Sequence, residues 1–256
     1  MYAFVSSLSY PFRAIRLIVG QPALWRFIII PIGLNVLVGF VLYTTILLAG
    51  LQAIDVLLTE WPNWIAWLVR GLLMIALFIG LGYLLVRFGV IIGSPFYSRL
   101  SELLEEQLLG IRLSAPPITL ANVARDFSRA ALFEVKKLLL TLAIGLPTLL
   151  LNLIPGVGSV LATIAGIALG ATIACLDFLD PPLERRRLTF RAKLGFIHRH
   201  LPASAGFGLI CLLLVSIPLF NLLAVPICIT AGTLFFCDRI RSLPPGQKLP
   251  AIGTIR

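Results

Sequence analysis

The residues of this chain with the clearest chemical potential are arginines that stand at the ends of long apolar segments. Arg26 follows a polar lead-in that begins at Gly20, and it opens an uncharged run that continues to Ile54. If this run is a helix, its first N–H groups lack intrahelical partners and the positive end of its dipole lies beside Arg26. A guanidinium next to such N–H groups provides the donors that a tetrahedral oxyanion accepts. From the residues alone, Arg26 is interpreted as a basic anchor that faces anionic lipid, and the alternative is an oxyanion site at the helix start.

A second arginine, Arg87, interrupts another apolar run. An arginine at the middle of a bilayer costs about 2.5 to 3.5 kcal/mol, so the side chain would face protein or a water-filled cavity. The alternative is that the helix stops soon after Ile92 and Arg87 reaches the membrane surface. The residues alone leave both interpretations open.

The other titratable residues do not form a constellation that is typical of an enzyme. The chain has no His-Glu-x-x-His and no Gly-x-Ser-x-Gly motif, and a glycine-rich phosphate loop would need a strand that the sequence does not predict. We therefore expect neither an enzyme nor a bound metal or cofactor. Glu102, Glu105 and Glu106 are interpreted as a solvated helix face, and Asp177 and Asp180 as helix-capping residues. The cysteines, interpreted as small buried residues, are Cys175, Cys211, Cys228 and Cys237.

The composition shows what kind of scaffold must position these arginines. Of 256 residues, 59% are hydrophobic and only 12% are charged, with a net charge of +10. A soluble domain carries about twice this share of charged residues. The composition excludes a disordered chain and a disulfide-rich secreted scaffold, and it predicts an integral membrane protein. Apolar runs of helical length, with no convincing strand among them, predict that it is all-α, in a single membrane domain of residues 1–256.

Two long helices are expected to cross the membrane. The uncharged residues 27–54 exceed the roughly 20 residues that a helix needs to cross a bilayer. A second helix is predicted at residues 63–92, after a short passage with Trp61, Trp64 and Trp67. Such tryptophans are typical of the membrane–water interface.

Residues 94–137 are predicted to form amphipathic helices on the cytoplasmic side of the bilayer. Ser94 and Pro95 are a suitable N-cap and first-turn proline. Leucines then recur at helical spacing up to Gly110, which is a plausible helix stop. A second amphipathic helix is expected from Leu120 to Lys137.

Two further apolar stretches, residues 138–176 and 201–237, are 39 and 37 residues long and carry no charge. Each is too long for one crossing and barely long enough for two. Prolines, glycines and asparagines break the stretches near Asn152 and Asn221. We therefore expect two helical hairpins, separated by a basic segment at residues 177–200. The residues alone leave open whether these hairpins cross the bilayer fully.

The positive charge is not spread evenly. Four of the five polar segments are net basic, and residues 55–70 carry the only net negative charge, −1. Because basic segments remain in the cytoplasm, we expect a multi-pass protein with both termini cytoplasmic and with contacts to anionic lipid.

Short motifs form an ordered set over nearly the whole chain. They are Gln21–Pro31 followed by Asn35, Ser94–Phe96, Leu103–Gly110, Leu153–Gly158, Leu176–Glu184, Leu188–Arg191, Gly206–Gly208, Ile217–Pro226 and Ala231–Thr233. In this order they resemble the bacterial CysZ sulfate permeases, whose wider family includes the etoposide-induced proteins of eukaryotes.

The resemblance implies a homo-oligomer in the bacterial inner membrane that takes up sulfate for cysteine biosynthesis. It also implies that both hairpins penetrate the bilayer only partly. In that family sulfate meets a Gly-hydrophobic-Arg-Arg turn at the start of the first long helix. The matching residues here are Ala23, Leu24, Trp25 and Arg26, so alanine replaces the glycine and tryptophan the first arginine.

The resemblance and the residues together suggest a route for the anion. Sulfate or a related oxyanion would be captured at Arg26 and would pass between subunits, past Arg87 and the hairpin tips at Asn152 and Asn221. No nucleic-acid partner is expected. The alternative is a non-transporting membrane scaffold, whose hairpins and basic helices would wedge one leaflet.

Overall fold

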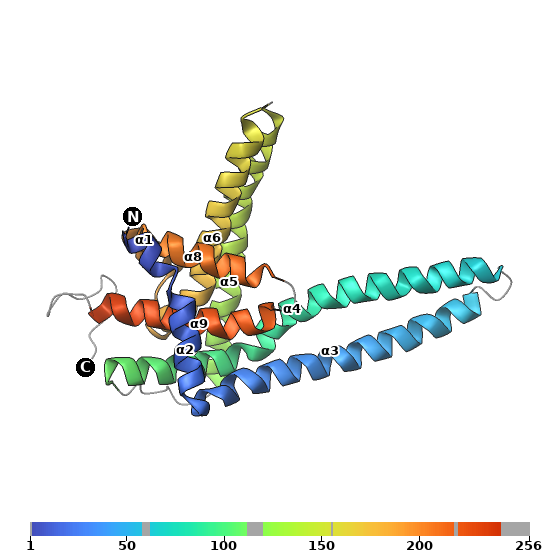
Figure 1. Ribbon diagram of the computed structural model, residues 1–256, viewed down its shortest axis with the longest axis horizontal. Coiled ribbons are helices and arrows are strands. Elements are labelled where there is room, and N and C mark those ends of the chain that lie inside the picture. The colour runs from blue at the N-terminus through green and yellow to red at the C-terminus, as the bar shows by residue number, and fades with distance from the viewer. Residues whose placement is uncertain (1, 58–61, 112–119, 155, 218–219, 242–256) are drawn as a thin grey trace. The chain divides into compact units, whose positions relative to one another are not determined.

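The structure is a computed structural model that describes residues 2–57, 62–111, 120–154, 156–217 and 220–241, and every regular element in these ranges is helical (Figure 1). This confirms the predicted all-α class. In chain order the elements are α1 (Tyr2–Ser7), α2 (Tyr10–Gly20), α3 (Pro22–Leu57), α4 (Asn63–Leu109), α5 (Leu120–Leu150), the 3-10 turn η1 (Leu151–Leu153), α6 (Gly158–Arg185), α7 (Phe190–Arg199), α8 (Ala203–Val215) and α9 (Asn221–Arg241).

The helices form two compact units. The first, here called the hairpin unit, is Pro22–Tyr97, and the second, the packed unit, comprises residues 1–21 and 98–256. Within the described residues, four helices are long and apolar enough to cross a membrane, or up to five if the bent pair α7–α8 counts as one span. The chain is therefore an all-α membrane protein.

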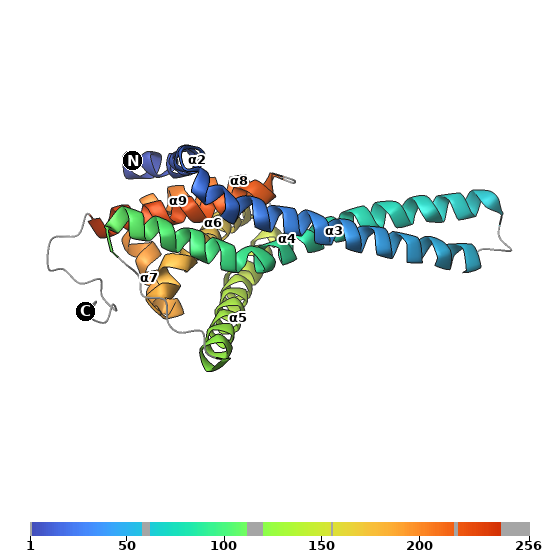
Figure 2. The ribbon, with the colours of Figure 1, turned by 90° about the horizontal axis from the view of Figure 1, so that it is seen from below.

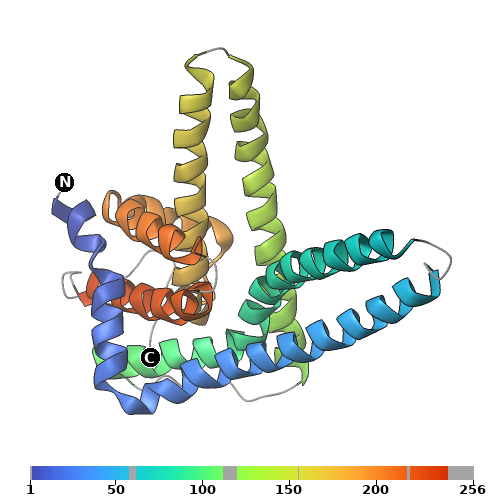
Figure 3. The same ribbon diagram turned by 45° about the vertical axis from the view of Figure 1, so that its right-hand side comes forward.

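In the hairpin unit, α3 and the first part of α4 run in opposite directions beside each other (Figures 1 and 3). An exposed ion pair between Asp55 and Arg70 joins the helices near their connection. Gly50 faces the side chain of Leu73. Many large apolar residues of both helices, such as Phe40 and Phe78, are exposed, as is expected for surfaces that contact lipid acyl chains.

The helix α4 does not stop at the predicted break. It continues through Pro95 to Leu109, so the predicted N-cap at Ser94 is wrong. A proline removes one intrahelical hydrogen bond, and the regular leucine spacing beyond it preserves the helix. The predicted stop at Gly110 is confirmed, because this residue has a φ of 67° and its N–H donates to the Glu106 carbonyl over 2.9 Å.

In the packed unit, α6 lies at the centre and contacts α8 and α9 over long stretches. Glycines make this close approach possible. A Cβ atom on Gly208 would lie 2.2 Å from the Ala171 carbonyl oxygen, and one on Gly232 would lie 2.1 Å from that of Phe178. Both oxygens belong to the α6 backbone, which cannot move aside easily. The two glycines therefore fix how α8 and α9 sit on α6.

The two predicted hairpin breaks are present. Helices α5 and α6 form a long hairpin whose tip contains η1 (Figure 3). The α6 side of the tip begins after Gly156, which has a φ of 82°. The second break separates α8, which ends at Val215, from α9, which begins at Asn221. The helix α5 starts at Leu120 and passes the expected boundary at Lys137 without interruption.

The N-terminal helices pack on the same core, with α1 against α8 and α2 against α9 (Figure 2). The Tyr10 ring meets the Phe207 and Phe235 rings edge-on. Its hydroxyl donates to Asp238 over 3.0 Å, and Arg13 pairs with the same carboxylate at 2.8 Å. Burial and the neighbouring Asp238 raise the pKa of Tyr10, so this hydroxyl remains a hydrogen-bond donor.

Candidate functional site

The four residues predicted to hold an anion lie in the first turn of α3. Ala23 and Arg26 are exposed, Trp25 keeps 44% of its surface exposed, and Leu24 is buried. The backbone at Ala23 is helical, so the alanine fits without the positive φ that would favour glycine. The replacement of glycine by alanine therefore leaves the local backbone intact.

The Arg26 guanidinium is held only loosely. Its Cζ atom lies 4.8 Å from the centre of the Phe27 ring, and the side chain is exposed. The N–H groups of a guanidinium lie in its own plane, so they can still donate to an anion when its face rests on an aromatic ring. Together with the N–H groups of the first helical turn, Arg26 can bind one oxyanion at the protein surface.

The other residues of the predicted route are placed separately. Asn152 lies in η1 at the hairpin tip, where its amide donates to the Leu149 carbonyl over 3.1 Å. Asn221 is half-buried at the first position of α9. Both belong to the packed unit, whereas Arg26 belongs to the hairpin unit. Arg87 lies within α4, and its side chain is outside the described part of the structure.

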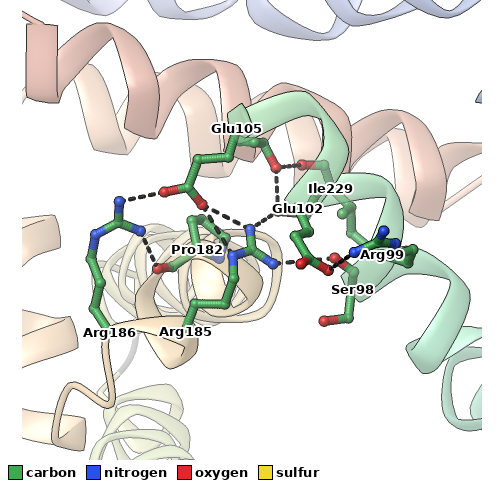
Figure 4. A network of polar contacts seen from close by, with 10 residues as sticks. Ser98, Arg99, Glu102, Glu105, Pro182, Arg185, Arg186 and Ile229 are labelled. Carbon is green, nitrogen blue, oxygen red and sulfur yellow. Dashed lines mark hydrogen bonds and ion pairs between the residues drawn. The ribbon is translucent and has the colours of Figure 1, made fainter. Parts of the chain in front are cut away.

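A charged network inside the packed unit was missed by the sequence interpretation (Figure 4). The Glu105 side chain on α4 is fully buried, although the sequence suggested a solvated face. Its Oε2 atom accepts hydrogen bonds from Arg185 Nε over 3.1 Å and from Arg185 Nη2 over 3.0 Å. Its Oε1 atom accepts a hydrogen bond from Arg186 Nη2. One carboxylate thus joins two consecutive arginines at the end of α6.

Hydroxyl and carbonyl groups complete this network. Arg185 also donates to the Ser101 hydroxyl over 2.6 Å and to the Ser98 carbonyl over 3.1 Å. The Ser101 and Thr233 oxygens lie 2.8 Å apart, which brings α9 into the network. Arg186 donates to the Pro182 carbonyl over 3.0 Å. Charge-assisted bonds of this kind are stronger than neutral ones, so the network fastens α4, α6 and α9 together.

A second set of ion pairs surrounds three acids on α6. Asp177 accepts from Lys137 over 2.7 Å, while Asp180 and Glu184 accept from the buried Lys193 over 2.5 and 2.6 Å. The predicted capping role of Asp177 and Asp180 is wrong, because both lie inside α6 and bind lysines from α5 and α7. Burial lowers the pKa of Lys137, but Asp177 and Glu134 outweigh this effect and raise it overall. Arg129 also approaches Glu184, at 3.5 Å, so three bases offset the three acids on α6.

The sequence contained a signal for the buried glutamate. Tyr97, Leu100 and Leu104 are buried on one face of α4, and residues 101 and 105 lie beside them at helical spacing. An acid inside an apolar stripe, with a serine four residues earlier, indicates a buried polar contact rather than a wet surface. The run Arg185–Arg187 supplies the opposite charge. The prediction that all four cysteines are buried is confirmed.

The fold defines a multi-helix membrane protein. The chain belongs to the family described as Sulfate transporter CysZ/Etoposide-induced protein 2.4, whose model matches residues 10–226. A relative from Pectobacterium atrosepticum, named Sulfate transporter CysZ, is 28% identical over 241 residues, which cover 93% of this chain and 86% of the relative. The resemblance inferred from the ordered motifs is thus confirmed.

Proposed function

We propose that this chain transports sulfate or a closely related oxyanion across the bacterial inner membrane and supplies sulfate for cysteine biosynthesis. The observation that carries the proposal is membership of the sulfate transporter family over residues 10–226. The relative named as a sulfate transporter supports it, since its similarity extends over 93% of the chain. The exposed, basic start of α3 is the structural feature that suits this substrate.

The first step of the proposed mechanism is capture of the dianion at α3. Its oxygens would accept hydrogen bonds from the first-turn N–H groups and from Arg26. A hydrogen bond to a charged group contributes about 1.5 to 3 kcal/mol. Because tryptophan stands at position 25, a single guanidinium serves this site, and we expect weak capture that suits rapid release.

The later steps involve more than one copy of the chain. We infer that the anion passes between subunits of a homo-oligomer, past Arg87 and the polar tips at Asn152 and Asn221. The basic segments would remain on the cytoplasmic side with both termini and would contact anionic lipid there. Cross-linking of the protein in native membranes tests the oligomer, and a chain that remains monomeric contradicts this step.

The direct test of the proposal is uptake of labelled sulfate into proteoliposomes. We expect saturable uptake that unlabelled sulfate competes away, and Arg26→Ala should raise the half-saturating concentration about tenfold, for a lost interaction of about 1.4 kcal/mol. Arg16→Ala is the matched control, since Arg16 is an exposed arginine on α2. Uptake no greater than in protein-free vesicles would contradict transport and favour the scaffold instead.

A further inference from the structure

The buried arginine pair has the composition of an anion site. Arg185 and Arg186 are neighbours in sequence, and their guanidinium groups converge on the single carboxylate of Glu105 (Figure 4). The Ser101 hydroxyl lies beside these guanidiniums and accepts a hydrogen bond from Arg185 Nη2 over 2.6 Å. Two guanidiniums and a hydroxyl are the donors that proteins use for tetrahedral oxyanions.

Arg185 and Arg186 share one carboxylate between them. Arg185 and Arg186 bring two positive charges, while Glu105, which is fully buried, brings one negative charge. The neighbouring Glu102 pairs with Arg99 at 2.7 Å, and Glu184 pairs with Lys193. A dianion would neutralise the two guanidiniums more completely than the single carboxylate does.

The hydrogen-bonding capacity of the pair is also not exhausted. The Arg186 side chain is only 9% exposed, and its buried Nε atom has no hydrogen-bond partner among the residues that the structure describes. A buried donor without an acceptor is rare in folded proteins and calls for an explanation. Arg185 keeps 18% of its side-chain surface exposed, so the pair is not fully enclosed on that side.

We propose that Arg185, Arg186 and the Ser101 hydroxyl form an oxyanion site that Glu105 occupies as an internal counter-anion, and that sulfate or a similar dianion binds there by displacing the Glu105 carboxylate. This inference rests on the proposed function, to which it adds a second binding site in the packed unit. Arg186 Nε supplies the additional donor for an anion with four oxygens. The Thr233 hydroxyl, 2.8 Å from that of Ser101, positions the serine.

Stepwise exchange of the carboxylate for the dianion explains how sulfate can enter this buried site. Two buried guanidiniums without an anion are strongly unfavourable, so the site must always hold either the glutamate or an external anion. If the incoming dianion takes the Arg185 bonds before the carboxylate leaves Arg186, the positive charges are never exposed to an apolar interior. The resident carboxylate then lowers the apparent affinity for sulfate, because it must first be displaced.

A purely structural ion pair and an occupied oxyanion site differ in what can replace the carboxylate. If Glu105 only joins α4 to α6, the stability lost with its carboxylate cannot be restored by an added oxyanion. If it occupies an oxyanion site, an added oxyanion takes its place. The decisive observation is therefore the anion dependence of a variant that lacks the carboxylate.

The experiment uses the purified full-length chain with Arg26→Ala, so that the exposed site on α3 does not contribute. With Glu105→Ala added, we expect sulfate to raise the melting temperature in a saturable way, with a half-saturating concentration at least tenfold below that of the parent. Chloride and acetate at equal ionic strength should not replace sulfate. Equal stabilisation by chloride would overturn the inference. Glu102→Ala is the matched control, and it should leave the sulfate dependence unchanged.

A shorter acid keeps the test decisive if Glu105→Ala does not fold. Glu105→Asp retains the charge but reaches less far toward the arginines, so it should compete less and lower the half-saturating sulfate concentration several-fold. An unchanged concentration would overturn the inference. Failure here is distinct from failure of the proposed function, because uptake by the wild-type chain tests transport and does not depend on the Glu105 variants.

Discussion

Arg26 and the Arg185–Arg186 pair present the same chemical group in opposite surroundings. Arg26 is exposed at the start of α3 and rests against the Phe27 ring. The pair lies in the packed unit, where a fully buried carboxylate bridges its two members. The Arg26 guanidinium is exposed, whereas the other two guanidiniums are already paired with the Glu105 carboxylate.

This difference shows how burial changes the task of an arginine. In water an unpaired guanidinium costs little, but its attraction for an anion is weak and is screened by salt. In the interior the same attraction is much stronger, yet the charge cannot be left without a partner. An exposed arginine is therefore suited to capture an anion, and a buried pair is suited to select or retain one.

The largest expected effect is the loss of the buried carboxylate. Without added sulfate, Glu105→Ala should lower the free energy of unfolding by about 3 to 5 kcal/mol, because two guanidiniums lose their shared anion. Denaturant titration in detergent measures this loss. Arg26→Ala is the comparison variant, with an expected change below about 0.5 kcal/mol. Equal stability of the two variants would contradict the claim that the buried network contributes more to folding than the exposed Arg26.

A smaller loss is expected at the second buried cation. Lys193→Met keeps the side-chain volume but leaves Asp180 and Glu184, whose side chains are 30% and 38% exposed, without their lysine. Water reaches both acids, so we expect a loss of about 2 kcal/mol in the free energy of unfolding. Lys136→Met, at an exposed lysine on α5, should change stability little. If both variants behave alike, the burial of Lys193 has no energetic consequence.

The exposed arginine should affect binding and not stability. In calorimetric titration with sulfate, Arg26→Ala should weaken the surface site about tenfold, or about 1.4 kcal/mol, and Arg26→Lys should recover part of it. Raising the ionic strength with chloride should weaken this site as well, since an exposed charge is screened. Sulfate binding that is indifferent to both changes would contradict a role for Arg26.

The smallest effect is expected at an exposed ion pair. Asp55 and Arg70 join α3 to α4, and their side chains are 60% and 35% exposed. Asp55→Asn should change the free energy of unfolding by about 0 to 1 kcal/mol. A loss comparable with that of Glu105→Ala would mean that exposure does not separate weak ion pairs from strong ones in this protein.

Periodicity and charge patterns predicted the fold class and the two hairpin breaks. Gly110 was recognised as a stop because a positive φ is easiest for glycine. Pro95 was misread as the start of a new helix, since the same residue type is tolerated inside a helix when its neighbours continue the pattern. A local signal could not distinguish these two cases.

The sites were predictable only in part. The basic start of α3 follows from local sequence, because the end of a helix and the arginine beside it are neighbours in the chain. The network around Glu105 joins residues about 80 positions apart, and no local pattern specifies which arginines meet the glutamate. What could be recognised is that an acid at position 105 falls within a buried stripe and requires a partner.

The central claim, that this chain moves sulfate, is tested most directly by counterflow. Proteoliposomes preloaded with unlabelled sulfate are placed in a low concentration of labelled sulfate, so the result does not depend on the energy source. We expect a transient accumulation of label above the external concentration, and no accumulation in vesicles preloaded with chloride. Label that merely equilibrates, at the same rate as in protein-free vesicles, would contradict the account.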